Sequence, residues 1–169
     1  MILFLDTEFT GLGQRWPRLI SIGLVSEDGQ QSFYAELAAE SYMEKVTPWV
    51  QANVLPLLDG GEGVVQPDEL RQRLAAWLRA FDSVQIACDA QDYDMKFLEA
   101  ILDPLPWNVK SKPLTLLFDA EPGERFADAV EAAFAGGLRR HHALDDAKAN
   151  RLGWIACGDV AAILRDAAR

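Results

Sequence analysis

The chain begins Met1-Ile-Leu-Phe-Leu-Asp6-Thr-Glu8-Phe9-Thr10-Gly11, in which five apolar residues lead into two carboxylates and then a glycine. A continuous apolar run that ends at a turn signal predicts a strand buried on both faces, in the centre of a sheet. Side chains alternate along a strand, so Asp6 and Glu8 share one face at its C-terminal end. Two unpaired carboxylates beside a low-dielectric core are unfavourable unless a cation meets them. The stretch therefore predicts a divalent-metal site that needs further carboxylates from elsewhere in the chain.

Length and composition bound the class of protein. The 169 residues fit one domain, and a hydrophobic content of 50% suffices for a full core. The sequence has no stretch as long and apolar as a membrane span, and its N-terminus lacks the basic start and cleavage site of a signal peptide. We therefore expect a single cytoplasmic domain, 1–169, without a membrane partner. Cys88 and Cys157 lie in apolar contexts without metal-type spacing, which predicts two reduced, packed thiols.

The net charge counts against an extended nucleic-acid surface. Lys and Arg number 16 while Asp and Glu number 26, which gives a formal charge of −10. Proteins that bind nucleic acid non-specifically are usually basic. Two divalent cations held by four carboxylates would offset only part of this charge. We therefore expect any polyanionic substrate to be held at one end, by metals and a few local cations.

Strand and helix patterns alternate along the rest of the chain. We expect further strands over 19–25, 32–37, 83–88 and 114–118, and helices over 67–81, 90–102, 125–134, 143–156 and 159–168. A meander followed by alternating strands and helices predicts an α/β fold, a mixed five-stranded sheet with helices on both faces. This layout resembles that of ribonuclease H-like domains, although element order alone does not single that fold out. Trp49 and Trp77 are expected in the core, on helical faces.

The helix predicted over 90–102 offers several candidates for a third ligand. From Asp94, the positions three, four and seven residues further on are all large and apolar, which places Asp94 on the core-facing stripe. The same offsets from Asp92 give a solvated face, where Lys96 can pair with Asp92. Asp89 is interpreted as the helix cap. Asp94 is therefore the preferred ligand, and a carboxylate that only caps the first turn is the alternative.

A fourth acidic group lies in segment 138–147, which contains both histidines of the chain and the adjacent acids Asp145 and Asp146. On its own, this pattern is equally typical of an ordinary helix start, where acids interact favourably with the helix dipole. Asp146 has only small neighbours along its helical face, which suits a close approach to the sheet, whereas Asp145 faces Lys148. The small neighbours are Ala143, Ala149 and Gly153.

These segments together resemble the three motifs of the DEDDh superfamily of 3′–5′ exonucleases, to which proofreading subunits, ribonuclease T and oligoribonuclease belong. The motifs are Asp6-Thr-Glu8-Phe-Thr-Gly, Tyr93-Asp94-Met-Lys-Phe97-Leu98 and His141-His-Ala-Leu-Asp-Asp146-Ala. They occur in the expected order and span nearly the whole chain. The opening motif, with Leu19-Ile-Ser-Ile-Gly and Trp49-Val-Gln-Ala-Asn-Val-Leu-Pro, is similar to a small bacterial exoribonuclease branch typified by a mycobacterial protein.

The resemblance implies two divalent cations, Mg²⁺ or Mn²⁺, held by Asp6, Glu8, Asp94 and Asp146. The extra acid Asp92 leaves the third ligand open to some degree. The motif spacing assigns His141 rather than His142 as the general base. The family pattern also places Phe9, Thr10 and Leu12 near the terminal nucleotide, and relatives of this superfamily often form homodimers.

We therefore expect a 3′–5′ exonuclease that releases nucleoside 5′-monophosphates from single-stranded RNA or DNA 3′ ends, with RNA or 3′ overhangs as the preferred substrate. The alternatives are an exodeoxyribonuclease, an endonuclease of ribonuclease H type that does not need the histidine motif, and a catalytically silent nucleic-acid-binding module. The presence of every catalytic group counts against the silent module. Candidate contacts for bases and phosphates are Arg15, Trp16, Arg18, Lys110, Lys112, Arg139 and Arg140.

Overall fold

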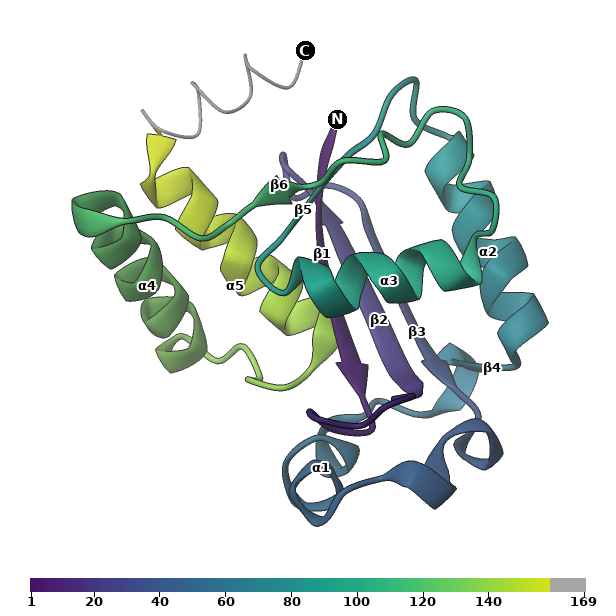
Figure 1. The fold of residues 1–169 in the computed structure, drawn as a ribbon. Helices are drawn as coiled ribbons and strands as arrows, with labels where there is room; N and C mark the ends of the chain where they lie inside the picture. The colour runs from purple at the N-terminus through teal and green to yellow at the C-terminus, as the bar shows by residue number, and fades with distance from the viewer. Residues whose placement is uncertain (159–169) are drawn as a thin grey trace.

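A mixed sheet with helices on both faces forms the centre of the computed structural model, which describes residues 1–158 (Figure 1). Its six strands follow the order β4-β3-β2-β1-β5-β6. They are β1 (Ile2–Phe9), β2 (Leu19–Ser26), β3 (Ser32–Leu37), β4 (Val64–Val65), β5 (Gln85–Cys88) and β6 (Leu114–Thr115). The first three strands pair antiparallel, and the others join the sheet parallel to their neighbours. The ribonuclease H-like α/β class is thus confirmed.

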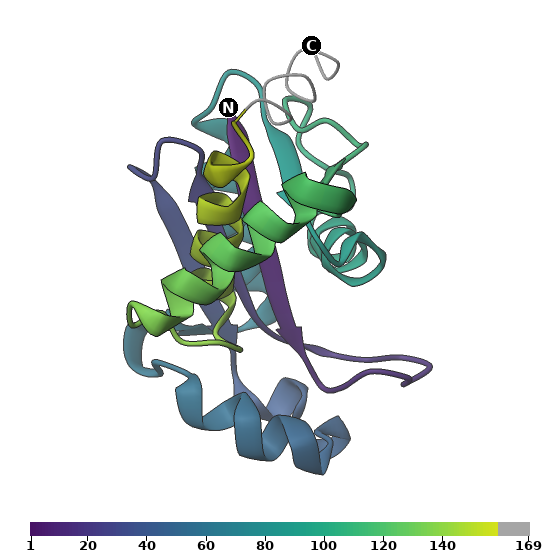
Figure 2. The ribbon, with the colours of Figure 1, turned by 90° about the vertical axis from the view of Figure 1, so that its left-hand side faces the viewer.

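Two helices cover one face of the sheet and two lie on the other (Figures 1 and 2). The α-helices are α1 (Pro48–Asn53), α2 (Pro67–Arg79), α3 (Gln91–Ile101), α4 (Ala120–Ala135) and α5 (Ala143–Ala156). Short 3₁₀ turns are η1 (Ala39–Ser41), η2 (Met43–Lys45), η3 (Leu55–Leu57) and η4 (Gly61–Gly63). Helix α5 lies between the sheet and α4, while α1 lies beyond the C-terminal end of β1 (Figure 1).

The central strand is buried on both faces, as its apolar run predicts. Leu3 and Leu5 belong to the larger core cluster, which includes side chains of α2 and α3. Ile2 and Phe4 belong to a second cluster beneath α5, where the Phe4 ring packs edge-on against Trp154 at 6.0 Å between centroids. Because apolar packing holds β1 from both sides, the carboxylates at its end start from a rigid position.

Helix α5 approaches the sheet closely above Gly23 of β2. Gly23 pairs with Asp6 in the β1–β2 register, and a Cβ there would lie 2.3 Å from the backbone nitrogen of Leu144. Only glycine therefore lets the first turn of α5 rest on the strand beside Asp6. Gly153, which was expected to face the sheet, instead faces α4, where a Cβ would lie 2.7 Å from the ring of Phe126. Gly23 of the sheet and Gly153 of α5 thus allow the helix to pack closely against β2 on one side and against α4 on the other.

Several expected boundaries differ from the structure. The sequence predicted five strands, but the two-residue strand β4 was missed because it is too short to show an alternating pattern. Strand β6 is shorter than the expected 114–118, and α4 begins at Ala120 rather than at residue 125. Cys88 and Cys157 are buried, reduced thiols, as predicted. The helix expected over 159–168 lies outside the described residues.

Within residues 1–158, no helix combines the length and the apolarity that crossing a membrane requires.

Candidate active site

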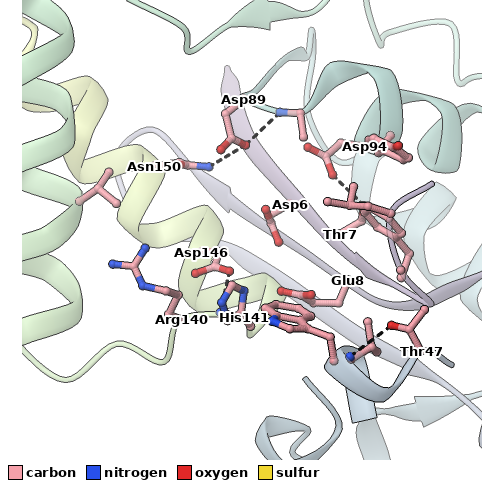
Figure 3. A pocket seen from close by; sticks show the side chains of 18 of the residues that line it. Asp6, Thr7, Glu8, Thr47, Asp89, Asp94, Arg140, His141, Asp146 and Asn150 are labelled. Carbon is pink, nitrogen blue, oxygen red and sulfur yellow. Dashed lines mark hydrogen bonds between the residues drawn. The ribbon is translucent and has the colours of Figure 1, made fainter. Parts of the chain in front are cut away.

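A pocket of about 880 Å³ opens where β1 ends, between α1, α3, α4 and α5 (Figure 3). One part of its lining carries acidic and imidazole side chains: Asp6, Glu8, Asp89, Asp94, His141 and Asp146. Another part is apolar and aromatic: Phe9, Leu12, Trp49, Tyr93, Val130 and Phe134. A single cavity therefore presents ligands suited to hard cations next to a surface suited to a nucleobase.

The structure brings together the four predicted carboxylates and the predicted histidine, although they are far apart in sequence. Asp6 and Glu8 come from β1, while Asp94 and Asp146 lie in the first turns of α3 and α5. Ligand-type atoms form two groups, each with mutual distances within 4.8 Å. The groups are Glu8, His141 and Asp146, and Asp6, Asp89 and Asp94. The second group contains Asp89, which the sequence did not predict as part of the site.

Hydrogen bonds orient the acids but leave oxygen atoms without donors. Thr7 Oγ1 donates to Asp94 Oδ1 at 2.7 Å, and the His141 backbone nitrogen donates to Asp146 Oδ2 at 2.9 Å. Among the described residues, no donor reaches the other oxygen of either carboxylate or Oδ2 of Asp6, and all three atoms are buried. Buried, unpartnered oxygens of this kind are costly unless a ligand completes them. The residues present therefore fit divalent cations such as Mg²⁺ or Mn²⁺, which prefer oxygen ligands.

The electrostatics of the pocket also favour a bound cation. Burial, followed by repulsion from Asp146 and Asp94, raises the pKa of Glu8 to about 8. Burial also raises the pKa values of Asp94 and Asp146 to about 7 each, although hydrogen bonds to these carboxylates act to lower them. The pKa of Asp6 is raised well above its usual value, first by burial and then by the surrounding acids. Such a cluster needs positive charge to remain ionised at neutral pH.

The two adjacent histidines occupy different environments. His141 lines the pocket with a left-handed backbone (φ 69°), and its ring meets Trp49 edge-on at 4.9 Å between centroids. Burial, followed by the charge of Arg140, lowers the pKa of His141. His142 is fully buried, stacks on Tyr34 at 4.5 Å and accepts from the Asp145 backbone nitrogen at the start of α5. Only His141 of this pair can therefore face a substrate in the pocket.

The acids near the start of α3 differ from expectation at one position. Asp92 is exposed and pairs with Lys96 at 3.7 Å, as predicted. Asp89 was predicted to cap α3, but this is wrong, because the helix begins after Ala90 without a side-chain cap. Asp89 Oδ1 instead accepts from the Ala90 backbone nitrogen at 3.0 Å and from Asn150 Nδ2 at 3.3 Å. This placement depends on the hydrogen bond from Asn150 of α5, a contact distant in sequence that no local pattern reveals.

Of the three predicted substrate contacts, two line the pocket. Phe9 lines the wall and stacks on Tyr93 at 4.7 Å between ring centroids, and Leu12 is 74% exposed at the opening. Thr10 is fully buried outside the lining, and its hydroxyl donates to Gln14 and accepts from the Arg18 backbone nitrogen. Thr10 therefore braces the loop after β1.

Trp49 was expected in the core, which is wrong, because 54% of it is exposed and it lines the pocket beside His141. Trp77 is half-buried against Phe33 and Phe81.

Of the predicted cationic contacts, Arg140 alone lines the pocket within residues 1–158. Its guanidinium pairs with Glu131 at 2.7 Å and lies 4.1 Å above the Phe134 ring.

A second acidic cluster lies behind the pocket, on the other side of the first turn of α5. Arg139 donates to Asp145 Oδ2 at 2.7 Å and to Asp59 Oδ1 at 2.6 Å. The hydrogen bond from Arg139 lowers the pKa of Asp59, and that of Asp145 is lowered as well, although burial acts to raise it. Glu36 is 2% exposed and accepts from the Tyr34 hydroxyl and from the backbone nitrogens of Asp59 and Gly60. We call this set the Arg139 network: Tyr34, Glu36, Asp59, Arg139, His142 and Asp145.

Comparison with known proteins adds the family. No curated protein matches the chain significantly. A family model described as the 3′-5′ exoribonuclease Rv2179c-like domain matches residues 1–157. The match runs from the strand that carries Asp6 and Glu8 to the helix that carries Asp146, and so includes every acidic side chain of the pocket. The chain therefore belongs to the family of Rv2179c-like 3′–5′ exoribonuclease domains.

Proposed function

We propose that this protein is a metal-dependent 3′–5′ exoribonuclease, which removes nucleoside 5′-monophosphates from the 3′ ends of single-stranded RNA or of 3′ overhangs. The observation that carries the proposal is the set of three buried carboxylate oxygens, on Asp6, Asp94 and Asp146, for which the described residues offer no donor. They lie in one cavity with an imidazole and an aromatic wall. The family supports exoribonuclease activity in general terms.

In this proposal the carboxylates of Asp6, Glu8, Asp94 and Asp146 hold two divalent cations, Mg²⁺ or Mn²⁺. Bound there, such a pair would lower the pKa of the attacking water and stabilise the charge on the scissile phosphate. Asp6 would contribute to binding the cation on its side of the pocket, where its carboxylate lies close to those of Asp89 and Asp94. The oxygen-rich donor set favours hard cations over softer metals.

His141 acts as the general base that accepts a proton from the attacking water. Its lowered pKa keeps the ring neutral, and thus able to accept a proton, at neutral pH. The hydrogen bond from its backbone nitrogen to Asp146 and the contact with Trp49 hold the ring at the pocket wall. Its proximity to Glu8 and Asp146 places this proton acceptor at the acidic centre, where the water must be activated.

The terminal nucleoside occupies the apolar part of the pocket. Trp49 offers an exposed ring, and Leu12 offers an exposed apolar side chain at the opening. Aromatic stacking binds any base without reading its identity. Because the chain carries a net charge of −10, binding through the 3′ end suits it better than binding along an extended basic track.

The proposal is tested with 5′-labelled single-stranded RNA, the matching DNA and a duplex with a 3′ overhang, each incubated with Mg²⁺ or Mn²⁺. We expect a ladder of products shortened one nucleotide at a time on RNA, release of nucleoside 5′-monophosphates, and no reaction in excess EDTA or with Asp146→Asn. Internal fragments would instead indicate an endonuclease of ribonuclease H type. A ladder on DNA alone would indicate an exodeoxyribonuclease, and intact substrates under all conditions would contradict catalysis.

A further inference from the structure

Asp89 occupies a position in the pocket for which the proposed mechanism has no use. It directly follows β5, which pairs parallel with β1, so the C-terminal ends of both strands lie at one edge of the sheet. Carboxylate oxygens of Asp6, Asp89 and Asp94 consequently lie within 4.8 Å of one another. Figure 3 shows Asp89 and Asp94 in the upper part of the pocket, with Asp6 below and between them. Asp89 is solvent-exposed, so the carboxylate can be reached from outside.

The Asp89 side chain is held in place by hydrogen bonds to only one of its oxygens. Oδ1 accepts from the Ala90 backbone nitrogen at 3.0 Å and from Asn150 Nδ2 at 3.3 Å. Asn150 is 6% exposed and belongs to α5, so the contact joins the two walls of the pocket. Within residues 1–158, no hydrogen bond to Asp89 Oδ2 is observed, which leaves that oxygen available to a ligand.

A second observation separates this arrangement from an ordinary cluster of surface acids. Asp94 is 1% exposed, and its buried Oδ2 has no donor among the described residues. The same is true of Oδ2 of Asp6. The negative charge of Asp89 adds to the repulsion, because the oxygens of the three carboxylates lie within 4.8 Å of one another. A cation between the three carboxylates would satisfy these oxygens and remove the repulsion.

We propose that Asp89 is a fifth acidic ligand of the metal centre, binding the cation that Asp6 and Asp94 hold. The inference rests on the proposed function, because it concerns one of the two cations of that mechanism. Asn150 is then a positioning residue, which orients the Asp89 carboxylate from α5. The charge of this rim carboxylate increases the affinity of the cation site beside Asp6 and Asp94 more than that of the site near Glu8 and Asp146.

The test compares Asp89→Asn with Asp92→Asn in the full chain. The asparagine oxygen at position 89 still accepts from Ala90 and Asn150, so only the charge is lost. Asp92→Asn removes the same charge from a nearby exposed site whose one ion pair is with Lys96. Mn²⁺ binding is measured without substrate, by calorimetry and by electron paramagnetic resonance. We expect Asp89→Asn to weaken one of two sites by about 10- to 100-fold, and Asp92→Asn to weaken neither.

Thermal unfolding provides a second measurement, in which Asp89→Asn should have opposite effects without metal and with Mn²⁺. Without metal, Asp89→Asn should raise the melting temperature because repulsion is relieved, and with saturating Mn²⁺ it should reduce the stabilisation that the cation provides. A lower metal-free melting temperature together with wild-type Mn²⁺ affinity would mean that Asp89 is a structural residue, and would overturn the inference. If that outcome is found while the wild-type protein still forms an RNA ladder, only this inference fails and the proposed function stands. If it forms no ladder and binds no Mn²⁺, the proposed function fails as well.

Discussion

The two acidic clusters on either side of the first turn of α5 contain similar residues. They differ in whether their carboxylates have hydrogen-bond and ion-pair partners within the described chain. In the Arg139 network, Asp59 and Asp145 share a guanidinium, and Glu36 accepts hydrogen bonds from three donor groups within the described chain. In the pocket, Asp94 and Asp146 each keep a buried oxygen without a donor there. The fold is thus able to satisfy buried acids with its own groups, and it does not do so in the pocket. The contrast indicates that the pocket acids are completed by something outside the chain.

Neighbouring residues of one helical turn are divided between the two clusters. Asp145 joins the Arg139 network while Asp146 faces the pocket, and His142 and His141 are divided in the same way. Successive residues of a helix point about 100° apart, so Asp145 and Asp146 face two different environments. The two histidines precede α5, and His141 has a left-handed backbone. One short segment therefore contributes both to the reactive site and to the network that holds it in position.

The largest expected effect comes from replacing one of the pocket acids. Asp6→Asn should reduce RNA cleavage by about 1,000-fold or more, since several kcal/mol of transition-state stabilisation is lost and each 1.36 kcal/mol is worth tenfold. Metal-free stability should rise in the same variant, because it removes a buried carboxyl group whose ionisation is opposed by burial and by the surrounding acids. Initial rates in Mn²⁺ and unfolding in EDTA measure the two effects.

The matched variant is Asp59→Asn in the Arg139 network, where Arg139 loses one of its acidic partners and keeps Asp145. It should lower stability while cleavage falls far less than in Asp6→Asn. Equal activity losses in the two variants would contradict a distinction between the clusters.

The histidine pair gives the next largest difference. His141→Gln should lower kcat by about 100-fold or more, as expected for loss of a general base, with stability close to that of the wild type. His142→Gln should mainly lower stability, because it removes a fully buried ring that caps α5 and stacks on Tyr34. Rates and urea unfolding of both variants decide the matter. If His142→Gln reduced kcat more than His141→Gln at full folding, the base would be assigned to the wrong residue.

The pH dependence of stability should distinguish the clusters without mutation. Folding raises the pKa values of Asp94 and Asp146 to about 7 and that of Glu8 to about 8, so the native protein binds more protons than the unfolded chain between about pH 4 and pH 8. Metal-free stability should therefore fall as pH rises through this window, by on the order of a few kcal/mol. Urea unfolding at several pH values in EDTA measures the slope.

Two controls accompany the pH series. Mn²⁺ should flatten or reverse the slope, because it binds the ionised carboxylates, and Asp94→Asn should reduce the slope in EDTA. The Arg139 network should behave oppositely, since the pKa values of Asp59 and Asp145 are lowered. Its contribution is present above about pH 4 and is lost as the pH falls below that. A metal-free protein whose stability increases between pH 5 and pH 8 would contradict the raised pKa values.

The smallest expected effect comes from removing the cation of the Arg139 network. Arg139→Met should destabilise the protein by about 2 kcal/mol, less than the loss typical of a fully buried pair because Arg139 is partly exposed. Arg73→Met is the matched control, since its ion pair with Glu69 is exposed on α2 and should be worth about 0.5 kcal/mol or less. Urea unfolding of both variants at pH 7 measures the difference, and equal losses would show that the network adds no stability.

Sequence patterns predict the parts of this molecule in which local and global signals agree. The apolar run of β1 and its alternation placed Asp6 and Glu8 correctly at the strand end, and the helical spacing of Asp94 predicted its burial. Asp89 was misassigned because its place depends on α5, which is distant in sequence.

Trp49 was misassigned for a different reason. It lies in a six-residue helix that starts at Pro48, too short for its periodicity to separate an exposed face from a buried one. Exposure of a large aromatic residue at a pocket is a property of the tertiary arrangement, so no local pattern indicates it.

Because Gly23 has no side chain, α5 can pack closely on the sheet next to the proposed metal centre. Asp6 comes from the sheet and Asp146 from the helix, so the gap between their oxygens depends on how near α5 sits to β2. A methyl group at Gly23 would push the two elements apart. Mg²⁺ demands ligands at about 2.0–2.1 Å, while Ca²⁺ accepts about 2.3–2.6 Å. In the proposed metal centre, selection of Mg²⁺ over Ca²⁺ would therefore depend on Gly23, a residue that is not itself a ligand.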